Sequence, residues 1–81
     1  MDAVYMRRIR DLREDADLNQ TQVAEMLGTS QTMYSRYERG VQELPLRHLI
    51  ALCRFYNVSA DYLLGFTNHP NPCGIRYGRR K

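Results

Sequence analysis

The stretch that most constrains the fold runs from Gln20 to Gly40, QTQVAEMLGTSQTMYSRYERG. It contains two short helical patterns separated by a glycine. In the first pattern Val23 and Leu27 are four residues apart, so they lie on one helical face. Gly28 follows at once, and a glycine directly after the last apolar residue is typical of the left-handed backbone position that ends a helix. The stretch therefore predicts two short helices joined by a tight turn.

The second helix of this pair has one apolar face and one polar face. Ser30 is a good N-cap, so we expect this helix over residues 30–39. Tyr34 and Tyr37 are three residues apart and face the first helix, where Ala24 is small enough for a close crossing. The residues that point away are of the types that contact base edges and phosphates: Gln31, Thr32, Ser35, Arg36 and Arg39. These features together indicate a helix-turn-helix.

A further helix is predicted ahead of this pair, over residues 4–16. Its apolar residues recur at i, i+4, i+7 and i+11, which is one face of an α-helix: Tyr5, Ile9, Leu12 and Ala16. Asn19 then fits as the N-cap of the next helix, over residues 20–27.

Two more helices are predicted after the helix-turn-helix. Pro45 suits the first turn of a fourth helix, where its missing N–H costs nothing. Apolar residues follow it at helical spacing: Leu46, Leu49, Ile50, Cys53 and Tyr56. Asn57 can take the left-handed position at the end of this helix. Ser59 is an N-cap for a short fifth helix over residues 60–64, closed by Gly65. The chain is therefore predicted to be all-α with five helices.

Positive charge is concentrated at the end of the chain. The formal net charge of the 81 residues is +3, but the last fifteen carry the basic residues Arg76, Arg79, Arg80 and Lys81 and no acidic residue. Residues 1–66 by themselves are about neutral. Bulk charge is therefore weak support for nucleic-acid binding by the folded part, and the argument rests on where individual side chains lie.

The character of the sequence changes after Phe66. The segment FTNHPNPCGIRYGRRK contains prolines and glycines and shows no helical periodicity, which is typical of an extended or mobile tail. We therefore expect a helix-turn-helix domain over residues 1–66 and a flexible or extended basic tail over residues 67–81. The tail could follow DNA as a salt-dependent, sequence-blind arm, help a dimer to form, or simply be solvated.

Several classes of protein are disfavoured by the composition. No apolar run approaches the roughly 18 residues of a membrane span, and the N-terminus lacks the apolar core of a signal peptide. Cys53 reads as a core residue, no C-x-x-C occurs, and a reducing cytoplasm is expected. An enzyme is not expected, because His48 has no nearby nucleophile. His69 and Cys73 offer two ligands where zinc needs four, so no metal or cofactor is predicted.

The segments LNQTQVAEMLGTSQTMYSRYERG and LPLRHLIALCRFYNVSADYLLG resemble the Cro and phage-repressor type of helix-turn-helix, the XRE family with its lambda-repressor-like DNA-binding domain. The resemblance covers residues 5–65. It implies a compact five-helix fold and a sequence-specific DNA-binding transcription regulator, a repressor, that inserts helix 30–39 into the major groove. Three residues depart from the family pattern: Thr29 and Tyr34 stand where branched aliphatic residues are usual, and Met33, interpreted as exposed, where small polar residues are commoner.

The resemblance also implies roles for individual residues. Gln31 would read adenine, Thr32 would meet a thymine methyl or a phosphate, and Arg36 would reach guanine or a phosphate. Ser35 would contact a base or remain plain surface. Phosphate contacts are implied for Gln20, Thr21, Ser30, Arg13, Arg39 and Gln42. Gln20 would also brace the first residue of the recognition helix, and Arg13 would pair with Glu38.

Partners follow from the same resemblance. Double-stranded DNA is the expected partner, bound as a homodimer on half-sites about one helical turn apart, and dimerisation could depend on DNA. The candidates for self-contact are Tyr62, Leu64 and Phe66. The alternative is a protein-interaction module, or the antitoxin of a toxin–antitoxin pair, with the same fold. The polar recognition face favours DNA over a protein partner.

Overall fold

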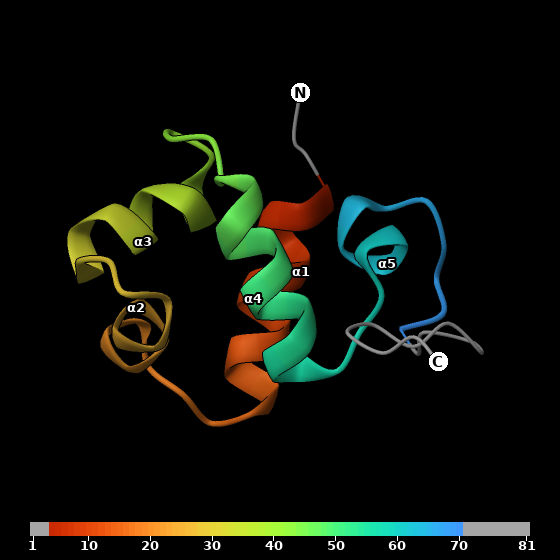
Figure 1. The fold of residues 1–81 in the computed structure, drawn as a ribbon, viewed down its shortest axis with the longest axis horizontal. Coiled ribbons are helices and arrows are strands. Elements are labelled where there is room, and N and C mark those ends of the chain that lie inside the picture. Colours follow the sequence, from red (N-terminus) through yellow and green to blue (C-terminus); the bar gives the residue numbers. More distant parts are fainter. Residues whose placement is uncertain (1–3, 71–81) are drawn as a thin grey trace.

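A computed structural model describes residues 4–70 of the chain, and these residues form five helices and no strand (Figure 1). The helices are α1 (Val4–Asp15), α2 (Gln20–Leu27), α3 (Gln31–Arg39), α4 (Leu46–Tyr56) and α5 (Ala60–Leu64). None of them is long and apolar enough to cross a membrane. The expected all-α, five-helix fold is confirmed.

The helix-turn-helix lies at one end of the molecule and α5 at the other, with α1 and α4 between them (Figure 1). α3 packs against both α2 and α1, while α5 packs against α1 and α4. α1 therefore contacts both ends of the domain.

The predicted helix caps are present in the structure. Asn19 accepts a hydrogen bond from the backbone N–H of Gln22, whose side chain in turn accepts from the Asn19 N–H, which completes a capping box. Ser30 accepts from Met33 N–H at 3.0 Å. Gly28 has φ 76°, the left-handed conformation that the turn between α2 and α3 requires.

Three predicted boundaries need correction by a residue or so. Ser30 precedes α3 as its N-cap, so the helix begins at Gln31. Pro45 is likewise the N-cap of α4 and not a residue of its first turn; its carbonyl accepts from the N–H groups of His48 and Leu49. α1 ends at Asp15, so Ala16 lies outside the helix and is exposed.

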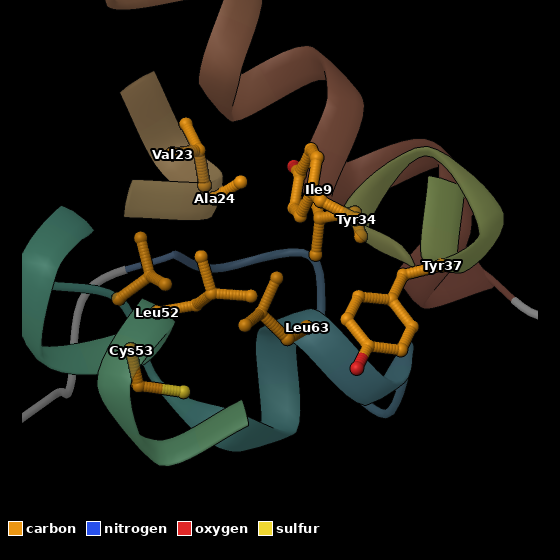
Figure 2. Close-up of a cluster of buried hydrophobic side chains, with 9 residues drawn as sticks. Ile9, Val23, Ala24, Tyr34, Tyr37, Leu52, Cys53 and Leu63 are labelled. Carbon is orange, nitrogen blue, oxygen red and sulfur yellow. The ribbon is translucent and has the colours of Figure 1, made fainter. Parts of the chain in front are cut away.

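One continuous core joins all five helices (Figure 2). It consists of Ile9, Val23, Ala24, Tyr34, Tyr37, Leu52, Cys53, Val58 and Leu63. The expected inward orientation of Ala24, Tyr34 and Tyr37 is confirmed. Met33, interpreted from the sequence as exposed, is half-buried and packs against this core.

The predicted apolar face of α4 was partly wrong. Leu46 and Ile50 are 69% and 45% exposed, whereas Leu52 is fully buried and His48 is 5% exposed. The His48 ring packs against the Tyr37 ring at a centroid distance of 5.7 Å. Because α4 carries apolar residues around much of its circumference, contacts with its neighbours decide which side is buried, and periodicity alone does not.

Candidate nucleic-acid interface

The outer face of α3 presents polar side chains on successive turns. Gln31, Thr32, Arg36 and Arg39 are exposed, and Ser35 is half-buried. Arg39 Nε donates to Ser35 Oγ at 3.2 Å, so these two side chains support each other along the helix. The guanidinium of Arg36 makes no hydrogen bond or ion pair with any residue in the described range, which leaves it available to a partner.

The opposite face of α3 fixes this orientation. Tyr34 and Tyr37 are 0% and 4% exposed, and their rings meet edge to face with centroids 6.3 Å apart (Figure 2). Two buried aromatic rings on one face prevent the short helix from rotating about its axis, because rotation would expose them to water. The polar face is therefore held outward by the core.

Arg13 of α1 and Glu38 of α3 form an ion pair beside this face. Arg13 Nε lies 2.7 Å from Glu38 Oε2, and Arg13 Nη2 lies 3.2 Å from Glu38 Oε1. Arg13 Nη1 also donates to the carbonyl of Leu18 at 3.0 Å. The two side chains are 13% and 4% exposed. All three guanidinium nitrogens of Arg13 thus donate within the protein, which favours a positioning role for this residue.

Two glutamine amides extend the ion pair to the beginning of α3. Gln20 Nε2 donates to Glu38 Oε1 at 3.0 Å, and Gln31 Nε2 donates to Gln20 Oε1 at 2.6 Å. An ionised carboxylate can only accept, so Gln20 must turn its NH₂ to Glu38 and its carbonyl to Gln31. Gln31 must then turn its own NH₂ to Gln20. The charge on Glu38 therefore fixes the orientation of both amides.

The electrostatic environment keeps Glu38 ionised. Burial alone raises the pKa of this carboxyl, but hydrogen bonds from Arg13 and Gln20 and the nearby Tyr34 hydroxyl lower it, and the net pKa is below its ordinary value. The hydrogen bond with Glu38 also raises the pKa of Arg13, against the effect of burial. The Tyr34 hydroxyl is near enough to act on the carboxyl but makes no well-formed hydrogen bond in the structure.

The remaining phosphate candidates surround the network. Thr21 is exposed at the beginning of α2, and Gln42 is exposed beyond the end of α3. The backbone N–H of Gln42 donates to the carbonyl of Arg36 at 3.3 Å. Ser30 is exposed, and its hydroxyl accepts as an N-cap while its own proton remains free to donate.

The dimerisation candidates lie at the other end of the domain, away from the helix-turn-helix. Leu64 and Phe66 are 42% and 77% exposed, whereas Tyr62 is half-buried. The guanidinium of Arg8 lies over the Tyr62 ring, 4.0 Å from its centroid. The structure thus leaves Leu64 and Phe66 open at the surface and covers one side of Tyr62.

Sequence reasoning missed the role of Arg8. Its guanidinium donates to the carbonyls of Tyr62 and Thr67, the latter at 2.7 Å, and to Asn68 Oδ1 at 3.0 Å. No spacing pattern could reveal this role, because its partners are mostly backbone carbonyls more than 50 residues away.

The beginning of the predicted tail contacts the helical body. The N–H of Ser59 donates to the Pro70 carbonyl at 2.8 Å, so the chain returns to the start of α5. Residues 71–81, with Cys73 and the basic residues Arg76, Arg79, Arg80 and Lys81, lie outside the described residues. The domain boundary at residue 66 and the role of the basic tail stay predictions.

Known proteins are similar to this chain in sequence and in fold. The chain matches the helix-turn-helix family HTH_3 over residues 9–63. It is 41% identical over 69 residues to the uncharacterized HTH-type transcriptional regulator YobD of Bacillus subtilis, and this match covers 85% of this chain and 62% of YobD. It is 40% identical over 55 residues to the cryptic phage CTXphi transcriptional repressor RstR of Vibrio cholerae. This match covers 68% of this chain and 50% of RstR. The chain thus spans less than two thirds of the length of these relatives.

Among solved structures, the P22 c2 repressor in complex with a synthetic operator superimposes with a TM-score of 0.69 at 32% identity. The match covers 78% of this chain and 96% of that chain. A transcriptional regulator from Listeria innocua superimposes with a TM-score of 0.76 at 22% identity, over 83% of this chain and 63% of that one, which supports the fold alone. On its sequence and its five-helix architecture, the chain belongs to the helix-turn-helix family HTH_3, of the Cro and phage-repressor type.

Proposed function

We propose that this chain is the DNA-binding module of a transcription regulator, a repressor that reads an operator by placing α3 in the major groove of double-stranded DNA. The observation that carries the proposal is the series of hydrogen bonds from Glu38 through Gln20 to Gln31. It fixes a glutamine amide at the exposed start of a helix whose other outward side chains are also polar. A side chain that must read a base edge benefits from such preorganisation, since less conformational entropy is lost on binding.

Gln31 and Arg36 are the proposed base-reading residues. Gln31 uses one N–H on Gln20, so its Oε1 and its second N–H remain to pair with adenine N6 and N7. Arg36 lies further along α3 with a free guanidinium, suited to guanine O6 and N7 or to a phosphate. Thr32 and Ser35 complete the proposed reading face.

Phosphate contacts orient the helix in this proposal. The phosphate-contacting residues lie at the start of α2, in the turn and at the end of α3: Gln20, Thr21, Ser30, Arg39 and Gln42. Arg13 holds Glu38 in place. Because residues 1–66 are about neutral, these few positioned donors must supply the phosphate contacts, and the salt dependence of binding should reflect a small number of released counterions.

A homodimer is part of the proposal, through the surface that includes Tyr62, Leu64 and Phe66. One domain of this size reads only a few base pairs, and two-fold pairing on half-sites about a helical turn apart supplies the missing specificity. The proposed function requires no catalytic step or cofactor. We propose that the protein acts in the cytoplasm.

The test is selection of bound duplexes from a random DNA pool, followed by affinity measurements on the selected sequence. We expect Gln31→Ala to relax the selected sequence at one position. Arg36→Ala should weaken binding by about 1–3 kcal/mol if Arg36 reads a base, with relaxed preference at that position. Loss of affinity without altered preference would assign Arg36 to a phosphate.

Arg54→Ala is the matched control. Arg54 is also an exposed helical arginine, but it lies on α4 and not on α3. It should change neither the sequence nor the affinity. Unchanged selection and affinity in both α3 variants would contradict the proposed groove-reading face.

A second candidate function is binding to a protein partner, as in an antitoxin. The chain is 32% identical over 66 residues to the antitoxin PezA of Streptococcus pneumoniae, and the match covers 82% of this chain and 42% of PezA. Large apolar side chains are also exposed in the described residues: Val41, Leu46, Ile50, Phe55, Leu64 and Phe66. DNA selection that yields no preferred sequence would favour this candidate over the first.

A further inference from the structure

The carboxylate of Glu38 has room for one more hydrogen bond. Oε1 accepts from Arg13 Nη2 and Gln20 Nε2, and Oε2 accepts from Arg13 Nε. An ionised carboxylate offers about four acceptor positions, so one position on Oε2 is left among the described contacts. Since the side chain is only 4% exposed, water is poorly placed to occupy it.

A buried donor lies one helical turn away. Tyr34 precedes Glu38 by four residues on α3, so the two side chains share a face of the helix. Tyr34 is fully buried, and its hydroxyl has no hydrogen-bond partner within the described residues. Buried hydroxyl groups in folded proteins nearly always have a partner, because leaving one unpaired costs its desolvation energy.

The Tyr34 hydroxyl and the Glu38 carboxylate also interact electrostatically. Burial raises the pKa of the Tyr34 phenol, and the Glu38 carboxylate raises it further. Tyr34 in turn is among the groups that lower the pKa of Glu38. The groups that act electrostatically on Glu38 come from four helices: Arg13 from α1, Gln20 from α2, Tyr34 from α3 itself and Tyr56 from α4. The hydroxyls of both tyrosines are buried and unpartnered within the described residues, but only Tyr34 shares the helix of Glu38.

We infer that the Tyr34 hydroxyl is the fourth hydrogen-bond donor to the Glu38 carboxylate and thereby a positioning residue for the amides of Gln20 and Gln31. Tyr34 touches no DNA in this arrangement. It holds the carboxylate from the core side, while Arg13 and Gln20 hold it from the other helices. The donor contact stands by itself, and the positioning role rests on the proposed function.

The donor contact is tested by measuring the pKa of the Glu38 side-chain carboxyl. The measurement is an NMR titration of the carboxyl across the pH range in a glutamate-labelled chain. Tyr34→Phe keeps the ring and removes only the hydroxyl, so we expect it to raise the pKa of Glu38. Tyr37→Phe is the matched control. Tyr37 is a buried tyrosine of the same helix whose hydroxyl lies on the other side of the cluster (Figure 2), and its removal should leave the pKa of Glu38 unchanged. An unchanged pKa in Tyr34→Phe would overturn the contact.

The positioning role is tested with the selected DNA sequence. Tyr34→Phe should weaken binding between about twofold and tenfold, the effect of one hydrogen bond. The pH at which acid abolishes binding should also move upward, because Glu38 is then protonated at a higher pH and loses the negative charge that holds Arg13 and Gln20 in place. Tyr37→Phe should change neither the affinity for DNA nor the pH at which acid abolishes binding.

The two parts of the inference fail in different ways. A raised carboxyl pKa with unchanged affinity and unchanged acid midpoint would overturn the positioning role alone. If the wild-type chain selects no DNA, the proposed function fails and the positioning role with it, while the carboxyl titration still decides the donor contact.

Discussion

Two arginines of α1 each secure one end of the domain, and they use different partners. Beside the recognition helix, Arg13 meets the carboxylate of Glu38 at 2.7 Å. At the other end, Arg8 donates to the carbonyls of Tyr62 and Thr67 and lies over the Tyr62 ring. A full negative charge compensates Arg13, whereas dipoles and an aromatic face surround Arg8.

This difference sets what each end depends on. The end held by Arg13 depends on both partners being present and on Glu38 being ionised. The end held by Arg8 depends on the planar fork of the guanidinium, which reaches several acceptors at once, and no carboxylate takes part in its described hydrogen bonds. Stability at the two ends should therefore respond differently to substitution and to acid.

The largest expected effect is at the charge-paired end. Glu38→Ala leaves the largely buried Arg13 with only the exposed carboxylate of Glu14, 3.9 Å away, and should lower the free energy of unfolding by about 3 kcal/mol, measured by urea denaturation. The double variant Arg13→Met with Glu38→Leu should recover much of this loss, because no charge is stranded. A loss below about 1 kcal/mol in Glu38→Ala would mean that the pair behaves as an exposed one.

The next comparison uses two glycines with left-handed backbones, one at each end. At Gly28, with φ 76°, an added Cβ meets nothing within 4 Å, so Gly28→Ala should cost only the backbone strain of about 1 kcal/mol. At Gly65, with φ 90°, the Cβ would lie 2.9 Å from Val4 Cβ. Gly65→Ala should therefore cost about 2–3 kcal/mol. Equal losses in urea denaturation would show that α1 moves aside freely at the α5 end.

A smaller effect is expected at Arg8. Arg8→Ala should cost about 1–2 kcal/mol and speed amide exchange at Ser59, whose N–H is bonded to the Pro70 carbonyl. Arg8→Lys should restore little, since an ammonium cannot span the same acceptors. Arg7→Ala, at an exposed neighbour, should stay within about 0.5 kcal/mol of wild type. Full rescue by lysine would show that charge, and not the fork, holds this end.

The smallest expected effect is the response to mild acid. Burial lowers the pKa of His48 below 6.5, so the folded state favours the neutral ring. Its contribution to stability is complete above pH 6.5 and is lost as the pH falls through the folded pKa. The Glu38 contribution, by the same linkage, is complete above pH 4.5 and is lost in stronger acid. His48→Gln should remove the loss of stability that begins below pH 6.5 and leave the loss due to Glu38 unchanged.

Amide exchange locates these acid effects. Protection in α3 should fall before protection in α5, because His48 packs on Tyr37 and Glu38 belongs to α3, whereas Arg8 contacts no carboxylate within residues 4–70. Simultaneous loss at both ends would contradict the distinction between them.

Much of the fold was predictable because its signals are local. Asn19, Ser30 and Ser59 cap helices by bonding to backbone N–H groups three residues on, and Gly28 and Asn57 take left-handed conformations that few residues adopt easily. The pairing of Glu38 with Arg13 came from a family resemblance and not from spacing, since the two residues are 25 positions apart. The bond from Gln20, 18 positions from Glu38, was not predicted.

The sequence by itself determined where the helices begin and end, to within about a residue, and which polar side chains α3 turns outward, because caps, glycines and helical periodicity act within a few residues. Only the tertiary structure decided which side of α4 is buried, that Arg8 secures the segment after α5, and that one carboxylate orients two amides. Those features depend on contacts between residues far apart in the chain, and their energies exist only once the helices have packed.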